Sequence, residues 1–236
     1  MPQFDNNVVV VTGAAGALGK AVADYFKQHG AGVAHLDVSE EILAESFPDQ
    51  SERTCLYLAV DLTDRESCQR GIAQIAEQFG RVDIIANIAG GFMMGDPLHE
   101  TSDATWDFLF NLNTRSILNT SAGIIPLMLR QGGGKVINIA ANGALSGAAT
   151  MGPYIASKSA VMRLTESMAL ELRDSNINVN CILPSVIDTP RNRKDMPDAD
   201  HSKWVKPSSI AEVIGFLASD VAKDIHGASL PVTGLS

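Results

Sequence analysis

The stretch from Asn7 to Lys20 reads "NVVVVTGAAGALGK" and joins a β-branched run to a glycine-rich turn. The four consecutive valines favour a short buried strand, which the glycines end. From Ala17 to about Gln28, apolar side chains recur at the spacing of one helical face. The stretch therefore predicts a strand, a tight turn and a helix in direct succession.

The same alternation continues along the chain. Strands are expected at 31–38, 55–62, 82–90, 134–141, 177–184 and 228–234, and helices at 66–80, 106–129, 153–173 and 209–218. Continuously apolar strands separated by helices indicate a parallel sheet covered on both faces. We expect residues 1–236 to form a single Rossmann-type, doubly wound α/β domain with a mainly parallel sheet of about seven strands.

One long segment, residues 185–206, shows no clear periodicity and reads "SVIDTPRNRKDMPDADHSKWVK". Loops of this length in a compact domain are usually functional or mobile. We expect this loop to cover a bound substrate.

Composition excludes several classes of function. Eighteen basic and twenty-seven acidic residues give a net charge of −9, and no basic run is present, so we expect no nucleic-acid or membrane partner. No segment approaches the roughly twenty apolar residues of a membrane span, and we expect a cytoplasmic protein. The three cysteines and five histidines are scattered without metal-ligand spacing, so no metal is expected.

The glycine-rich turn is typical of a dinucleotide site, with an ordinary tight turn as the alternative. Gly13 would permit the turn, Gly16 a close approach of backbone to a diphosphate, and Gly19 close packing of the helix on the strand. Ala17 and Leu18, at the start of the helix, would border the same diphosphate.

Asp37 ends the second expected strand, 18 residues beyond Gly19. Its carboxylate can accept hydrogen bonds from a ribose diol and would repel a 2′-phosphate. Neither Ala15 nor Val38 supplies a compensating cation, so NAD(H) is expected in preference to NADP(H). The alternative is a solvated turn residue at the end of a strand.

Tyr154 and Lys158 are four residues apart on one expected helix, and therefore on one face of it. A free phenol, with a pKa of about 10, is a poor base at neutral pH. A nearby ammonium and a positive nicotinamide ring would favour the phenolate, which suits proton transfer. The alternative is an ordinary pair on an amphipathic helix.

Together these motifs resemble the short-chain dehydrogenase/reductase family along nearly the whole chain. The matching motifs are "TGAAGALG" at 12–19, "DLTD" at 61–64, "NIAG" at 87–90, "NLNTRS" at 111–116 and "YIASK" at 154–158. The resemblance implies an NAD(P)-dependent oxidoreductase that acts on a small molecule and forms a homo-tetramer or homodimer.

The resemblance also assigns roles to individual positions. It implies Tyr154 as the acid/base, Lys158 as its support and Asn113 in a proton relay, although an asparagine can instead simply interrupt helical hydrogen bonding. It places further residues around the cofactor: Asp61 and Leu62 at the adenine, Asn87, Ala89 and Gly90 near the ribose, Pro184 in the pocket, and Thr189 at the nicotinamide amide. The chain departs from the family pattern at Ala17, at Ser185 and in "NIAG".

The most consequential departure is Ala141. The family has a serine thirteen residues before the tyrosine, and alanine has no hydrogen-bond donor. Removing one of two donors to a developing alkoxide typically costs about 10²–10³ in rate. Ser146 and Asn142 are the nearby candidates for a substitute donor.

Two other functions remain open on these grounds. The segment 183–204, "GALG", "AGG" at 89–91 and the alanine itself resemble dihydropteridine reductases, in which the proton goes to a ring nitrogen and a second donor is less necessary. A non-catalytic NAD-sensing protein is the third possibility, and the retained Tyr154, Lys158 and Asn113 argue against it. Phe92, Met93 and Met94 either line a substrate pocket or fill a core or an interface.

Overall fold

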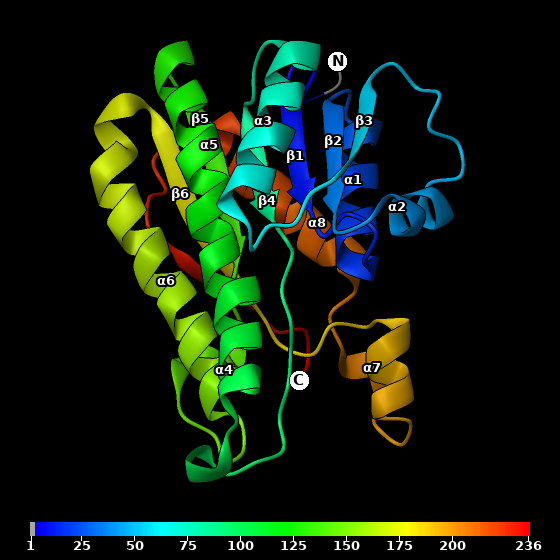
Figure 1. Cartoon of the computed structure of the whole chain (residues 1–236), viewed down its shortest axis with the longest axis vertical. Helices are drawn as coiled ribbons and strands as arrows, with labels where there is room; N and C mark the ends of the chain where they lie inside the picture. The colour runs from blue at the N-terminus through cyan, green and yellow to red at the C-terminus, as the bar shows by residue number, and fades with distance from the viewer. Residues whose placement is uncertain (1–2) are drawn as a thin grey trace.

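Consecutive valines of strand β1 (Val8–Thr12) pack on opposite faces of a sheet, as side chains of a strand must. In the computed structural model, which describes residues 3–236, Val9 and Val11 lie in one buried cluster and Val8 and Val10 in another. All four valines are buried because helices cover both faces (Figure 1).

The sheet has seven strands in the order β3-β2-β1-β4-β5-β6-β7, and every neighbouring pair is parallel. This arrangement confirms the predicted doubly wound α/β fold. The remaining strands are β2 (Gly32–Asp37), β3 (Cys55–Ala59), β4 (Ile84–Asn87), β5 (Gly134–Ile139), β6 (Ile177–Pro184) and β7 (Ser229–Val232).

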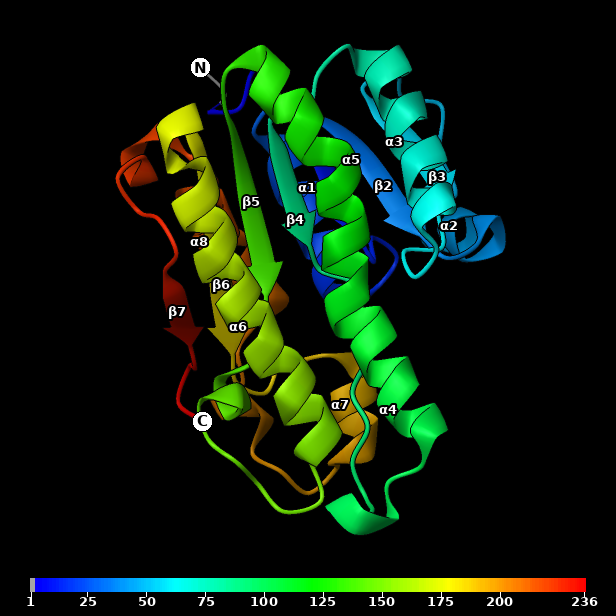
Figure 2. The same ribbon diagram turned by 60° about the vertical axis from the view of Figure 1, so that its left-hand side comes forward.

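Two helices, α1 (Ala17–Gln28) and α8 (Pro207–Ala218), cover one face of the sheet. Three others lie along the opposite face, at the front of Figure 2: α3 (Arg65–Phe79), α5 (Ser116–Gln131) and α6 (Gly152–Leu172). The shorter helices are α2 (Glu40–Ser46), α4 (Asp103–Phe110) and α7 (Pro190–Asp195). Within residues 3–236, no helix combines the length and the apolar character that a membrane crossing requires.

The structure corrects two details of the expected organisation. The helical region expected at 106–129 is broken into α4 and α5 by a π-helical turn at Asn111–Arg115. The segment 185–206 is not devoid of regular structure, since it contains α7 and a parallel bridge between Ile187 and Val205. Proline at the start of α7 and the capping hydroxyl of Thr189 explain this short helix, which is too short for periodicity to reveal.

A buried polar network crosses the middle of the sheet. The Asn138 side chain, on β5, accepts a hydrogen bond from Asn87 Nδ2 at 2.8 Å and donates one to Thr165 Oγ1 at 2.9 Å. Thr120 in turn donates to Asn87 Oδ1 at 3.1 Å. Asn138 and Thr165 are completely buried, so each depends on these partners for its hydrogen bonds.

We expect Asn138→Ala to lower the free energy of unfolding by about 1–3 kcal/mol, because it leaves the Asn87 amide buried without its acceptor. Urea denaturation of the variant and the wild type measures the difference. Asn111→Ala removes a partly exposed asparagine whose side chain accepts from Arg115, and it should cost under about 0.5 kcal/mol. Equal losses in the two variants would contradict the network's role.

Candidate active site

The turn between β1 and α1, residues 13–16, contains only glycine and alanine. Gly13 has a left-handed φ of +62°, and a Cβ there would lie 3.0 Å from Ala89 Cα. A Cβ on Gly19 would lie only 2.1 Å from Gly13 O, so the helix packs directly on the turn. Both close approaches require glycine.

The amino end of α1 is open to an anion. Gly16 is its N-cap and supplies no side-chain hydrogen bond, and the first turn holds no acidic residue. Within residues 3–236, the amides of Ala17, Leu18 and Gly19 have no backbone acceptor. Free amides and the helix dipole together suit a phosphate group. The residues present therefore fit the diphosphate of a dinucleotide.

Asp37 stands at the end of β2 and reaches back to this turn. Its carboxylate accepts from Ala15 N at 2.9 Å and from Val38 N at 2.8 Å. The sequence from Leu36 to Glu52 contains no lysine or arginine. A negative group at this position would therefore meet the Asp37 carboxylate with no neighbouring cation on that segment.

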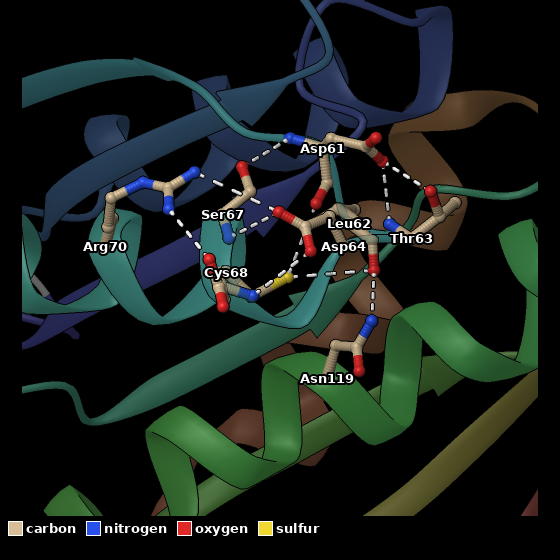
Figure 3. A network of polar contacts seen from close by, with 9 residues as sticks. Asp61, Leu62, Thr63, Asp64, Ser67, Cys68, Arg70 and Asn119 are labelled. Atoms are coloured by element: carbon tan, nitrogen blue, oxygen red, sulfur yellow. Dashed lines mark hydrogen bonds and ion pairs between the residues drawn. The ribbon is translucent and has the colours of Figure 1, made fainter.

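The turn that follows β3 is held rigidly, as Figure 3 shows. Asp61 accepts from Thr63 N at 2.8 Å and from Thr63 Oγ1 at 2.7 Å. Asn119, on α5, donates to Leu62 O at 2.9 Å. Sequence reasoning missed Asn119, because no local pattern shows that α5 passes beside this turn. The turn adjoins Asp37, since Val60 N donates to Asp37 O at 2.7 Å.

The residues that follow β4 are placed by Thr12, another residue that sequence reasoning missed. The buried Thr12 hydroxyl accepts from Ile88 N at 2.9 Å and from Ala89 N at 3.1 Å. Its position directly before Gly13 is the only sequence signal for this role. The Asn87 side chain lies inside the sheet network, where it donates to Asn138 and accepts from Thr120.

Asn113 sits in the π-helical turn and is buried. Its Oδ1 accepts from Gly91 N at 2.8 Å, and its Nδ2 donates to Gly91 O at 3.1 Å and to Ser157 Oγ at 2.9 Å. Ser157 donates to Tyr154 O at 2.8 Å. The asparagine thus links the turn after β4 to the helix that carries Tyr154, and Ser157 is a further residue that sequence reasoning missed.

Lys158 is buried, and its Nζ donates to Ile139 O at 2.8 Å. A Cβ on Gly90 would lie 3.0 Å from both Lys158 Nζ and Asn113 Oδ1. The glycine therefore leaves room for the two polar groups to approach the same point. Burial lowers the pKa of Lys158 to about 8.

Tyr154 is partly buried, and its ring packs beside the apolar cluster that contains Ala140, Ala141 and Ala144. Burial raises the pKa of Tyr154 to about 12. This shift belongs to the protein without cofactor, and burial is its cause. The predicted stabilisation of the phenolate also requires the positive nicotinamide ring and stays a prediction. A phenol held neutral in this way is a proton donor.

Ala141 is buried at the start of a short 3₁₀ turn, Asn142–Leu145, and has no donor to offer. The two proposed substitutes differ in environment: Asn142 is half-buried, whereas Ser146 is exposed at the end of the turn. Ser159 donates to Ala144 O at 2.9 Å and fixes the turn to α6.

Thr189 lies five residues beyond Pro184, the last residue of β6. Its hydroxyl accepts from Asn192 N at 3.2 Å and caps α7. Two backbone hydrogen bonds join the two ends of the segment 185–206. Asp188 N donates to Val205 O at 2.8 Å, and Val205 N donates to Val186 O at 3.0 Å. The carboxyl ends of the strands and α7 lie toward the same end of the molecule (Figure 2).

Comparison with known proteins agrees with this arrangement. A family model for short chain dehydrogenases matches residues 7–200. The chain belongs to the short-chain dehydrogenase/reductase family. It is 33% identical to an NAD-dependent glycerol dehydrogenase of Listeria innocua, over 97% of this chain and 93% of that protein. It is 30% identical to a 3-oxoacyl-acyl-carrier-protein reductase of Thermotoga maritima, over 98% of each chain.

Solved structures of the family show the same fold. Carveol dehydrogenase of Mycobacterium avium in complex with NAD superposes with a TM-score of 0.90 at 28% identity, covering 99% of this chain and 98% of that one. As a short-chain dehydrogenase/reductase, the protein is an oxidoreductase, which the sequence predicts. Among residues 3–236, no three or more His, Cys, Asp or Glu side chains gather as metal ligands would.

The buried lysine of this short-chain dehydrogenase/reductase should leave a signature in the pH dependence of stability. The pKa of Lys158 is about 8 when folded, against 10.5 for an ordinary lysine, so between these values the unfolded chain binds more protons. The free energy of unfolding of wild type, relative to Lys158→Met, should therefore rise with pH by on the order of 2 kcal/mol.

Urea denaturation at intervals from pH 7 to pH 10 measures this rise. Tyr154 lowers the free energy of unfolding as the pH rises, but only above its ordinary pKa of 10, because its pKa is higher in the folded protein than in the unfolded chain. Lys223→Met removes an exposed lysine and should run parallel to wild type. A wild-type curve parallel to that of Lys158→Met would show that burial does not disfavour the ammonium.

Proposed function

We propose that the protein transfers hydride between NAD(H) and a small carbonyl or alcohol substrate, with Tyr154 as the acid/base. The observation that carries this proposal is the convergence of Lys158 and Asn113 beside Gly90, with Tyr154 one turn before Lys158 on the same helix. That point lies next to the turn whose open amides suit a diphosphate.

The cofactor proposal rests on the geometry of the glycine-rich turn and on Asp37. The amides of α1 would hold the diphosphate, Asp37 the adenosine ribose, and Asp61 and Leu62 the adenine. Bound NADH supplies the hydride. The backbone at Ala89 and Gly90, together with Pro184 and Thr189, would then border the nicotinamide half.

The protein's part in the chemistry is to position groups and to move one proton. Tyr154 donates its phenolic proton to the substrate oxygen during reduction and recovers it in the reverse direction. Lys158 stabilises the phenolate formed, and Asn113 keeps the turn at Gly91 and the Tyr154 helix in register through Ser157.

The wider assignments extend the proposal. Residues 1–236 would act as one domain, and 185–206 would cover the substrate while α7 moves as a unit on its closed base. The protein would act on a small molecule in the cytoplasm as a homo-tetramer or homodimer. These assignments follow from the family and from the charge of −9.

We expect the protein to bind NADH roughly 100-fold more tightly than NADPH, because the 2′-phosphate would face the Asp37 carboxylate. Asp37→Ala should reduce the ratio of the NADPH dissociation constant to the NADH dissociation constant, and it should weaken NADH binding. Fluorescence titration of both cofactors measures the four dissociation constants. Glu171→Ala makes the same change of charge at an exposed position at the far end of α6 and should leave the ratio unchanged. Equal affinities in wild type would show that Asp37 does not set the preference.

A second candidate, reduction of a quinonoid dihydropteridine, is favoured by one observation, the buried Ala141. Protonation of a ring nitrogen needs only the tyrosine, so the absence of a second donor costs that reaction little. Reduction of a ketone develops an alkoxide, for which a second donor is normally worth about 10²–10³ in rate.

Ala141→Ser separates the two candidates. It should raise reduction of a ketone, by about tenfold or more, and leave reduction of a quinonoid dihydropterin unchanged. Tyr154→Phe should lower kcat for whichever substrate is used by about 10²–10⁴ while preserving NADH binding. NADH consumption with one substrate of each kind measures both effects. A Tyr154→Phe variant that matches wild type in turnover and binding would instead support an NAD sensor.

A further inference from the structure

We propose that the substrate is a neutral, apolar ketone or secondary alcohol, and that the Phe92 ring forms the wall beside the reacting group. This inference rests on the proposed function and names its substrate class. It is carried by the two segments that flank Tyr154, which expose large apolar side chains beside it and contain no lysine or arginine to hold an anionic group.

The first wall is the segment that follows β4. The Phe92 ring packs edge-on against the Tyr154 ring, with centroids 4.8 Å apart and planes at 83°. Phe92 is nevertheless 52% exposed, so it shields the phenol and also presents apolar surface outward. Met93 and Met94 follow it and are exposed as well. Large apolar side chains exposed together at a site mark a surface that binds something.

The second wall is the segment between β5 and α6, and it is tied to the first. Gly95 N donates to Thr150 O at 3.1 Å, which joins the two walls. Thr150 makes this contact with a left-handed φ of +61°, an unfavourable conformation for a β-branched residue. A cavity of about 50 Å³ lies between the walls, and its lining is Met93, Met94, Gly95, Asp96, Thr101, Thr105, Thr150 and Pro153. The hydrogen bond between Gly95 and Thr150 thus fixes the two walls relative to each other.

The first wall carries acidic residues, and the second carries no charged residue. Neither would attract an anionic substrate. From Val82 to Thr114 there is no lysine or arginine, and from Val136 to Ser157 there is no charged residue at all. The first stretch carries acids, among them Asp96, which is exposed. A carboxylate or phosphate seated between these walls would lose water and find no cation on either wall, which is unfavourable.

The segment that would cover the site, residues 185–206, holds most of its cations in ion pairs. Arg193 is paired with Asp188, with Nη2 2.8 Å from Oδ2, and Arg191 with Asp195, with Nε 3.5 Å from Oδ2. Within residues 3–236, Lys194 is the one cation of α7 without an ion pair. Met196, directly after α7, adds an exposed apolar side chain. Lys203 is paired with Asp200, and among the described residues the exposed Lys206 at the end of the segment has no ion pair. The cover therefore presents two unpaired lysines, Lys194 and Lys206, besides Met196.

The test compares two ligands of similar size on the NAD⁺-loaded protein, which cannot reduce them, namely 4-methylcyclohexanone and 4-oxocyclohexanecarboxylate. We expect the neutral ketone to bind at least about 100-fold more tightly, measured as Kd by NMR titration. Equal or tighter binding of the carboxylate, or no binding of the neutral ketone, would overturn the inference. NADH oxidation is measured in parallel, so a ketone that binds without being reduced would refute the proposed function and leave the inference standing.

Variants locate the effect. Phe92→Ala should weaken binding of 4-methylcyclohexanone about tenfold or more, and Phe92→Leu, which keeps an apolar side chain, should recover part of that loss. Leu170→Ala removes an exposed apolar side chain near the far end of α6 and should change nothing. Lys194→Ala should leave both Kd values unchanged. If it abolishes carboxylate binding, the cation of α7 selects the substrate and the inference is wrong.

Discussion

The close contact between the turn after β1 and the turn after β4 is the constraint on which the site depends. Gly13 can approach Ala89 only because it has no side chain, and Thr12 holds Ile88 and Ala89 by their amides. Since the strands are parallel and adjacent, their carboxyl ends meet at one edge of the sheet. The groups suited to a diphosphate and the groups suited to proton transfer are therefore set side by side.

Beside that contact, hydrogen bonds link the turn after β4 to the backbone of Tyr154 on α6. Asn113 holds both polar backbone groups of Gly91 and reaches Ser157, which holds Tyr154 O. The same region is poor in water, and burial moves the pKa of Tyr154 up and that of Lys158 down. Both shifts disfavour charge, so burial keeps the phenol protonated, while the hydrogen bonds tie the helix that carries it to the turn after β4.

The sequence alone was sufficient for the fold and for the place of the glycine-rich turn between β1 and α1. Continuous apolar strands and intervening amphipathic helices are local patterns, and they dictate a parallel sheet covered on both faces. Gly13, Gly19 and Asp37 could also be found locally, because a glycine turn between a strand and a helix needs neighbours in sequence only. The pair Tyr154 and Lys158 is also visible in a short stretch of sequence, because residues four apart lie on one face of a helix.

Only the tertiary structure shows the hydrogen bonds and the burial that arise between residues far apart in the chain. Asn119 meets Leu62 from 57 residues away, and Asn138 meets Asn87 from 51, so no window of sequence contains either pair. The burial that raises the pKa of Tyr154 has the same origin, since an i,i+4 lysine is visible in the sequence whereas loss of solvent is not. Burial is a sum over contacts from many segments, and only the folded chain brings those segments together.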